Sequence, residues 1–380
     1  MKDKFAHWNV LFILYLKRDW KMILAWVIGL GAFCGGFVPA MEEIAKGEAL
    51  VGMYETLKNP AMIAMVGGTP ITNAADYTIG AMYGHMMLLF CGVFAMIVAV
   101  MHVVGHARKE EERGLTEFIC TYSIGRHANA FALMMEEFFV HILLALFISG
   151  LMILFQVESM DAAACMLFGC SVGLAGMIGA VIALLMSQLM ASSGGATASA
   201  LGIVGLMYMI RGGMDMSGTA VNWWNPMEWT YKSYPFAENN WKVFLPGIAF
   251  CLVISVISFV LEKGRDLGDG YIPEMGNRKK VKKSLLSIHG FLLRINRGTI
   301  IGWIITLAVF GAMYGSIYGD MQSFLKGNDL LKTMFQMQGI SIEASFTMTI
   351  MVILAGLTFI LPVCVMNRLY SEESLSLIHI

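Results

Sequence analysis

Ionisable side chains occur inside several long apolar stretches of this 380-residue sequence. Such groups are costly in a lipid bilayer, and they mark ion or proton pathways, metal sites or hydrogen bonds between helices. Glu136, Glu137 and His141 lie in one stretch, and His85 and His102 lie in the stretch before it. A metal site needs three or four ligands in one place, which this spacing alone does not provide. We therefore expect hydrogen bonds between helices here, and no metal.

A compact and charged segment, HARKEEERGLTEFICTYSIGRH, begins at His106. Leu115, Phe118, Ile119 and Tyr122 recur in it at helical spacing, which predicts a short amphipathic helix able to dock into a partner's groove. The alternative is a solvated loop whose basic residues only set the membrane orientation. The acidic run Glu110–Glu112 is not needed for that purpose, so we favour a docking element.

The composition indicates that these residues belong to a membrane protein. The chain is 57% hydrophobic and only 14% charged, whereas soluble domains carry about 25% charged residues. A helix needs about 20 apolar residues to cross the hydrocarbon core. We predict an all-α polytopic protein with about eight spans. They are Met22–Ala40, Ala81–Gly105, Asn129–Phe155, Ala162–Met190, Thr197–Ile210, Val243–Leu261, Thr299–Tyr318 and Ser345–Met366.

The distribution of lysine and arginine predicts the orientation. With the N-terminus in the cytoplasm, most of the 26 basic residues fall on the inner side, as the positive-inside rule requires. The segment before the first span then reads as a separate interfacial helix, with Trp8, Phe12 and Tyr15 facing the apolar phase. Glu136 and Glu137 lie two turns from the inner end, where their side chains can snorkel to the surface.

Two parts of the sequence resemble each other. LKRDWKMILAWVIGLGAF from Leu16 aligns with LRINRGTIIGWIITLAVF from Leu293, and the Glu111–Glu112 pair aligns with Glu372–Glu373. We infer a parallel duplication with six spans per copy. Residues 1–278 form the first copy, with its interfacial helix and docking loop, and residues 279–374 form the first two spans of the second.

The sequence carries no set of residues that would act as a catalytic site. It contains no G-x-x-x-x-G-K-[ST] phosphate loop and no nucleophile elbow or H-E-x-x-H motif. We therefore expect a protein that is not an enzyme. Any ATP hydrolysis coupled to it would belong to another chain.

Four segments together resemble the permeases of bacterial ABC exporters, in the polyketide-antibiotic and multidrug group of the type-2 ABC permeases. The segments are EEERGLTEFICTYSIGR, MIRGGMD, WWNPMEWTYKSYPFAENNW and RDLGDGYIPEMG. The loop pattern of that family falls on Glu111, Glu112, Gly114, Glu117, Ser123 and Arg126. The sequence departs from the family pattern at Asn225 and Glu228, where Ser and Gly are usual.

The resemblance implies a multi-pass permease in the bacterial plasma membrane that exports a hydrophobic, antibiotic-like compound. It also implies a separate ATPase in two copies, which would hold the ATP and Mg²⁺, so this chain would bind no cofactor itself. The loop of Glu111–Arg126 would be the coupling helix to that ATPase, and Glu372 and Glu373 would belong to its second copy. The alternative is an ion- or proton-coupled secondary carrier that uses the ionisable residues of the second and third spans.

The last six residues, Leu375–Ile380, read LSLIHI. They match a translation of the transposon end used as a sequencing adapter, and the similarity between the two copies stops at Ser374. We interpret the hexapeptide as an artefact and expect the natural chain to continue with a second docking loop and four more spans.

Overall fold

The computed structural model describes residues 4–45, 48–58, 60–217, 224–273, 287–319, 341–359, 361–363 and 365–366. The chain divides into two units, residues 1–275 and 276–380. Glu372, Glu373 and the final hexapeptide lie outside the described residues, so the predictions made for them stay predictions.

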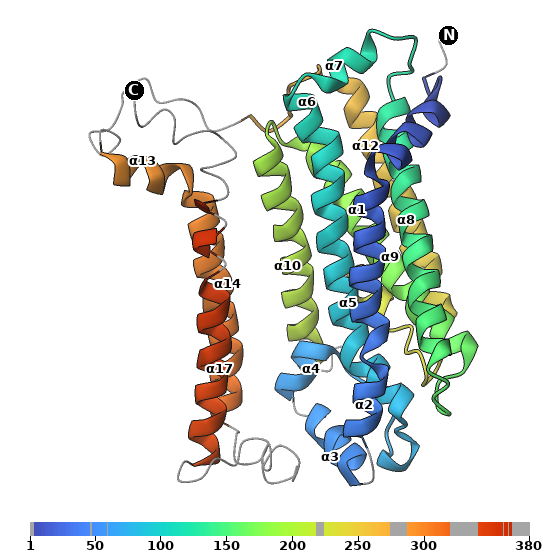
Figure 1. Ribbon diagram of the computed structural model, residues 1–380, viewed down its shortest axis with the longest axis vertical. Helices are drawn as coiled ribbons and strands as arrows, with labels where there is room; N and C mark the ends of the chain where they lie inside the picture. The colour runs from blue at the N-terminus through green and yellow to red at the C-terminus, as the bar shows by residue number, and fades with distance from the viewer. Residues whose placement is uncertain are drawn as a thin grey trace. The chain divides into compact units, whose positions relative to one another are not determined.

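Long helices build the first unit (Figure 1). They are α1 (Trp8–Gly36), α5 (Ile79–Val104), α8 (Ala128–Leu154), α9 (Ala162–Leu189), α10 (Ser193–Ser217) and α12 (Phe244–Gly264). In the part of the chain that the structure describes, these six carry the segments long and apolar enough to cross a membrane. The predicted all-α, polytopic membrane fold is confirmed, whereas the count of eight spans and the cytoplasmic N-terminus stay predictions.

Helix α9 is the centre of the bundle and packs against α5, α8, α10 and α12. The Asp161 side chain caps its start by accepting a hydrogen bond from the backbone N–H of Ala164 at 3.1 Å. Glycines at positions 169, 173, 176 and 179 let the neighbouring helices approach closely, because a Cβ there would collide with Ala145, His141 or Met96. Close packing of small residues is the main attraction between helices in lipid.

Two helix boundaries differ from the prediction. The interfacial helix predicted before the first span does not exist as a separate element, because α1 runs unbroken from Trp8 to Gly36. The fifth predicted span, Thr197–Ile210, is too short: α10 comprises 25 residues from Ser193 to Ser217 and includes the glycines at positions 194 and 195. In both cases no proline interrupts the sequence, and packing against neighbours extends the helix beyond its most apolar part.

Short elements cover the two ends of this unit. At one end lie the π-helical turn η2 (Gly105–Lys109), α6 (Glu110–Glu112) and α7 (Leu115–Cys120), and we name this the α7 end. At the opposite end lie α2 (Val38–Ile44), α3 (Glu48–Leu57), α4 (Pro60–Val66), η1 (Ala74–Asp76), α11 (Glu228–Tyr231) and η4 (Trp241–Val243). A second small apolar core that includes Tyr54, Leu57 and Tyr77 holds α3 and η1 against the start of α5.

The second unit contains α13 (Ile288–Ile295), α14 (Arg297–Gly319) and α17 (Ile342–Thr358). The latter two overlap the seventh and eighth predicted spans. The Ser287 side chain caps α13 by accepting from the backbone N–H of Gly290 at 3.1 Å. Here a short helix does precede a long one, with a break at Asn296, whereas the matching segment of the first unit is one continuous helix.

The packing of α9 yields a first prediction. Replacing Gly169 with alanine should destabilise the protein by about 1–3 kcal/mol, the usual cost of overpacking, because the new methyl group meets the Ala145 carbonyl and the Ser149 hydroxyl. Thermal unfolding of the purified protein in detergent measures the effect. Gly150→Ala, at a helical glycine with open space around it, is the control and should unfold like the wild type. Equal melting of both variants would contradict the packing role of Gly169.

Candidate functional site

The α7 end is organised around one carboxylate, that of Glu111. Arg265, which follows α12, binds it in a bidentate manner, with Nη1 2.5 Å from Oε1 and Nη2 2.7 Å from Oε2. The backbone N–H of Gly268 donates to Oε1 at 2.7 Å, and Arg108 Nη1 donates to Oε2 at 3.1 Å. Bidentate, charge-assisted hydrogen bonds of this kind are strong and directional. They join the loop after α5 to the loop after α12.

Arg108 is completely buried beneath this pair. Its guanidinium also donates to the carbonyl oxygens of Ala191 and Gly268 at 2.6 Å, and to that of Asp269 at 2.9 Å. The π-helical turn η2 places Arg108, because the extra residue in a π turn shifts the side chains that follow it. Three chain segments that are distant in sequence therefore meet at one buried arginine.

Glu112 extends the same junction to α10. Its Oε1 accepts from the backbone N–H of Ser193 and its Oε2 from the Ser193 hydroxyl, both at 2.5 Å. Ser193 begins α10, so a carboxylate at this position satisfies free N–H groups and favours the positive end of the helix dipole. Of the predicted coupling residues, Glu111 and Glu112 thus fix the loop to the bundle.

Arg126 closes the other side of the loop. Its Nη2 donates to the carbonyl oxygens of Glu262 and Arg265 at 3.0 and 2.6 Å. The neighbouring His127 lies 2.6 Å from Glu262 through Nδ1. The backbone N–H of Gly125 donates to the Ala6 carbonyl at 3.0 Å, so the start of the chain also contacts this loop.

The short helix α7 is anchored at both sides yet presents apolar side chains outward. Leu115, Phe118 and Tyr122 are 44%, 60% and 58% exposed. Gly114, with φ of +76°, starts α7 in a left-handed conformation that few residues other than glycine adopt. Glu117 and Ser123 are exposed beside the apolar residues. A cavity of about 270 Å³ lies beneath α7, with Thr116, Gln188 and Arg265 in its wall.

The intramembrane polar residues divide into two places. His102 on α5 hydrogen-bonds to Glu137 on α8, and His141 Nδ1 lies 2.8 Å from the Glu137 carbonyl. His85 lies at the opposite end of α5, between Tyr77 and the Gly67 carbonyl at 3.0 and 2.8 Å. Glu136 and Glu137 are 0% and 1% exposed, so the expectation that they snorkel to the surface is wrong.

Sequence reasoning missed a second junction, at the opposite end. The predicted fifth span ends at Ile210, but Arg211 lies buried within α10, where it pairs with Asp215 at 2.9 Å and donates to the Ala64 carbonyl. The Tyr231 hydroxyl donates to Asp215 at 2.7 Å. This contact joins the MIRGGMD and NPMEWTY segments. Both segments resemble the same family, and this shared resemblance was the sequence signal that could have indicated the junction.

The two residues that depart from the family pattern belong to this junction. The Asn225 side chain donates to the Met207 carbonyl at 2.8 Å and accepts from the Met227 N–H at 3.1 Å. Glu228 pairs with Lys232 at 2.6 Å, and burial raises the pKa of its carboxyl group. Both side chains are buried, so these two differences from the family pattern change the internal contacts of this end and not its outer surface.

Two comparisons with known proteins agree with this architecture. Residues 285–378 match the family model described as the C-terminal domain of the multidrug efflux system permease Rv1217c. The chain is 25% identical over 370 residues to the multidrug efflux system permease protein Rv1217c of Mycobacterium tuberculosis (strain ATCC 25618 / H37Rv). That alignment covers 95% of this chain and 65% of the relative. The resemblance to multidrug ABC-type permeases is thereby confirmed, as is a multi-pass location in the bacterial plasma membrane.

The Glu111 junction yields a second prediction. Glu111→Ala should lower the free energy of unfolding by about 3–5 kcal/mol, the cost of leaving a buried charge without its partner, because Arg108 stays buried. Unfolding in detergent, followed by tryptophan fluorescence, measures it. Glu117→Ala removes an exposed carboxylate from the same loop and should change the stability little. Similar losses in both variants would show that the buried pair does not hold this end together.

Proposed function

We propose that this chain is the membrane-spanning permease subunit of an ATP-driven exporter, and that α6 and α7 couple it to a separate ATPase. The observation that carries the proposal is the combination found at α7. Its outward apolar face is free in the described part of the chain, whereas its base is fixed by Glu111, Glu112 and Arg126 to the ends of α10 and α12.

This geometry suits the transfer of force. A partner bound to Leu115 and Phe118 would push on a helix that cannot slide independently of the bundle, because hydrogen bonds at its base connect it to the start of α10 and to the loop after α12. The cavity beneath α7 gives the helix room to move inward. Movement of α7 would therefore displace the ends of α5, α10 and α12 together.

The proposed cargo is a hydrophobic compound of the antibiotic or drug type. The support is similarity to a relative whose name states multidrug efflux, and fold similarity alone does not identify a substrate. The ATPase would bind ATP and Mg²⁺ and would be present in two copies. A growth comparison of cells with and without the full gene product, across a panel of hydrophobic antibiotics, tests the cargo class.

A secondary carrier coupled to ions or protons is the second candidate. The buried contact of His102 with Glu137 favours it, since ionisable groups inside the membrane often belong to transport pathways. Inverted membrane vesicles separate the two functions. ATP-dependent uptake that survives collapse of the proton gradient supports the exporter, whereas uptake driven by a pH gradient without ATP supports the carrier.

The docking role of α7 yields a third prediction. Leu115→Asp combined with Phe118→Asp, in the full gene product expressed with the ATPase encoded beside it, should reduce co-purified ATPase at least about tenfold, as loss of an apolar hot spot does. The melting temperature should stay near that of the wild type, because both side chains are exposed. Trp241→Asp changes an exposed aromatic residue at the opposite end and should leave the ATPase bound.

A change in loop geometry gives an independent check. Glu112→Lys with Gly114→Pro removes the cap on α10 and places a residue restricted to negative φ where φ is +76°. We expect ATP-dependent efflux to be lost even where the protein is still inserted in the membrane. If both the assembly with the ATPase and the efflux survived, α7 would not be the coupling element.

A further inference from the structure

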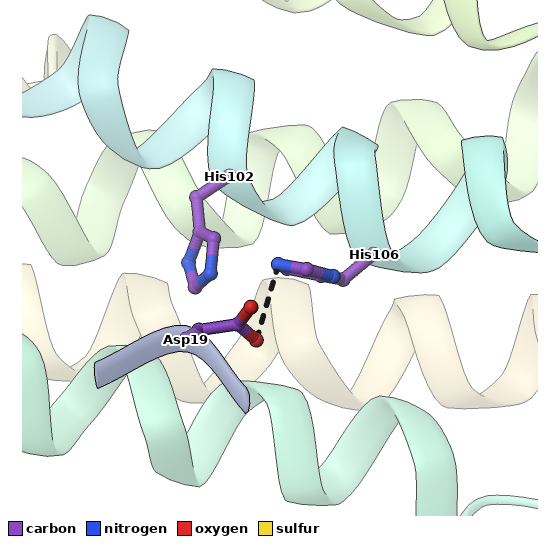
Figure 2. A group of neighbouring side chains, drawn as sticks. All are labelled: Asp19, His102 and His106. Carbon is purple, nitrogen blue, oxygen red and sulfur yellow. Dashed lines mark ion pairs between the residues drawn. The ribbon is translucent and has the colours of Figure 1, made fainter. Parts of the chain in front are cut away.

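A compact polar cluster lies between α1 and α5 and has no part in the proposed coupling. Asp19 comes from α1, and His102 and His106 come from successive turns of α5 and η2. Each side chain offers one ligand atom, and the three atoms lie within 4.8 Å of one another. Figure 2 shows both imidazole rings directed from one helix toward the Asp19 carboxylate on the other. His106 Nε2 is 3.6 Å from Asp19 Oδ2.

Carboxylates hold the far side of both rings. Glu137 contacts Nδ1 of His102, and Glu110 Oε1 is 2.7 Å from Nδ1 of His106. In metal sites a carboxylate typically binds the non-ligating nitrogen of a histidine, which fixes the tautomer and leaves the other nitrogen for the ion. His102 Nε2 fits that role, since it is buried and has no hydrogen-bond partner among the described residues.

The charge of the surroundings favours a cation. Four carboxylates gather at the cluster, those of Asp19, Glu110, Glu136 and Glu137, and all are less than 10% exposed. Glu136 lies within electrostatic reach of His102 and Asp19, and neither of its oxygens has a partner in the described part of the chain. Among the described residues, Arg18 brings a guanidinium to this place, where it pairs with Asp19 and Glu110. Buried charges need compensation.

We propose that Asp19, His102 and His106 bind a divalent transition-metal ion of the zinc type. Nitrogen and carboxylate ligands suit Zn²⁺, whose bond lengths of about 2.0–2.2 Å hold tetrahedral ligands about 3.3 Å apart. Binding therefore draws the three side chains closer than their present spread. A water molecule would complete the coordination. The site is independent of the proposed transport function.

Arg18 controls access to the site. Its Nη2 lies 2.6 Å from Nδ1 of His106, and because a guanidinium can only donate, that nitrogen then carries no proton. Metal binding at Nε2 requires the ring proton to move from Nε2 to Nδ1, where it forms a hydrogen bond to Glu110. Arg18 then gives up its contact with Nδ1 and keeps its pairs with Asp19 and Glu110. The Arg18 side chain is 37% exposed, so it can move aside and let an ion reach His106.

Metal binding to the purified protein tests the proposal. The full gene product, isolated with a tag that contains no histidine, is dialysed against Zn²⁺ or Co²⁺ in detergent and analysed for bound metal. We expect one ion per chain, visible Co²⁺ absorption of a four-coordinate site, and a higher melting temperature with Zn²⁺. His102→Gln and Asp19→Asn should each weaken binding by more than the about 10- to 100-fold typical of an outer-shell change.

Two further variants show whether the position matters. His85→Gln is the matched control on the same helix, since both ring nitrogens of His85 are already hydrogen-bonded, and it should bind metal like the wild type. Glu137→Gln keeps all three ligands and should weaken binding only moderately, by releasing the His102 ring.

Two outcomes overturn the proposal. The first is a metal content below about one ion per ten wild-type chains at micromolar metal, a concentration at which zinc sites are ordinarily filled. The second is equal metal binding by the wild type and His102→Gln. In either case bound protons, and not a metal ion, would neutralise the negative charge of the carboxylates. If the ligand variants fail to fold, the Co²⁺ spectrum of the wild type and the behaviour of His85→Gln still decide. No assay involves the ATPase, so failure here leaves the coupling proposal unaffected.

Discussion

The α7 end depends on the carboxylate of Glu111. It receives four hydrogen bonds, from Arg108, from both Nη atoms of Arg265 and from the backbone of Gly268. A buried guanidinium such as that of Arg108 is costly unless it is paired, and here carbonyl oxygens and Glu111 pair both of its Nη atoms. Because these partners belong to the loops after α5, α9 and α12, the ends of three transmembrane helices are fixed relative to one another.

The opposite end uses the same device with different residues. Arg211 is again completely buried, again pairs with one carboxylate, and again donates to a backbone carbonyl distant in sequence, that of Ala64 in α4. Between the two junctions the helices share an apolar core, and the glycines of α9 bring α5 and α8 close to it. The first unit therefore combines close apolar packing within the membrane with directional polar junctions at its two ends. Such a construction lets a push at one end move whole helices rather than deform them.

The polar cluster of Asp19, His102 and His106 lies just within the α7 end. Arg18 on α1 pairs with Glu110, and His102 on α5 pairs with Glu137 on α8, so the cluster links α5 to α1 and α8, two helices that the Glu111 junction does not hold. The two assemblies are neighbours in sequence, since His106 and Arg108 share the π turn η2. One extra residue in a helix thus turns one side chain toward α1 and another toward α10 and α12.

The sequence by itself determined the class of protein, the positions of the long helices and the place of α7. Long apolar runs, charges and helical periodicity are local signals, and local backbone physics converts them directly into elements. It also identified Glu111, Glu112 and Arg126, but not their partners. Only the tertiary structure decided that Glu111 meets Arg265, that Arg211 is buried and that His102 and His106 face Asp19, because these contacts join residues far apart in the chain. The unbroken α1 and the full length of α10 were decided in the same way, by neighbours that cover residues which a hydropathy pattern leaves outside the membrane.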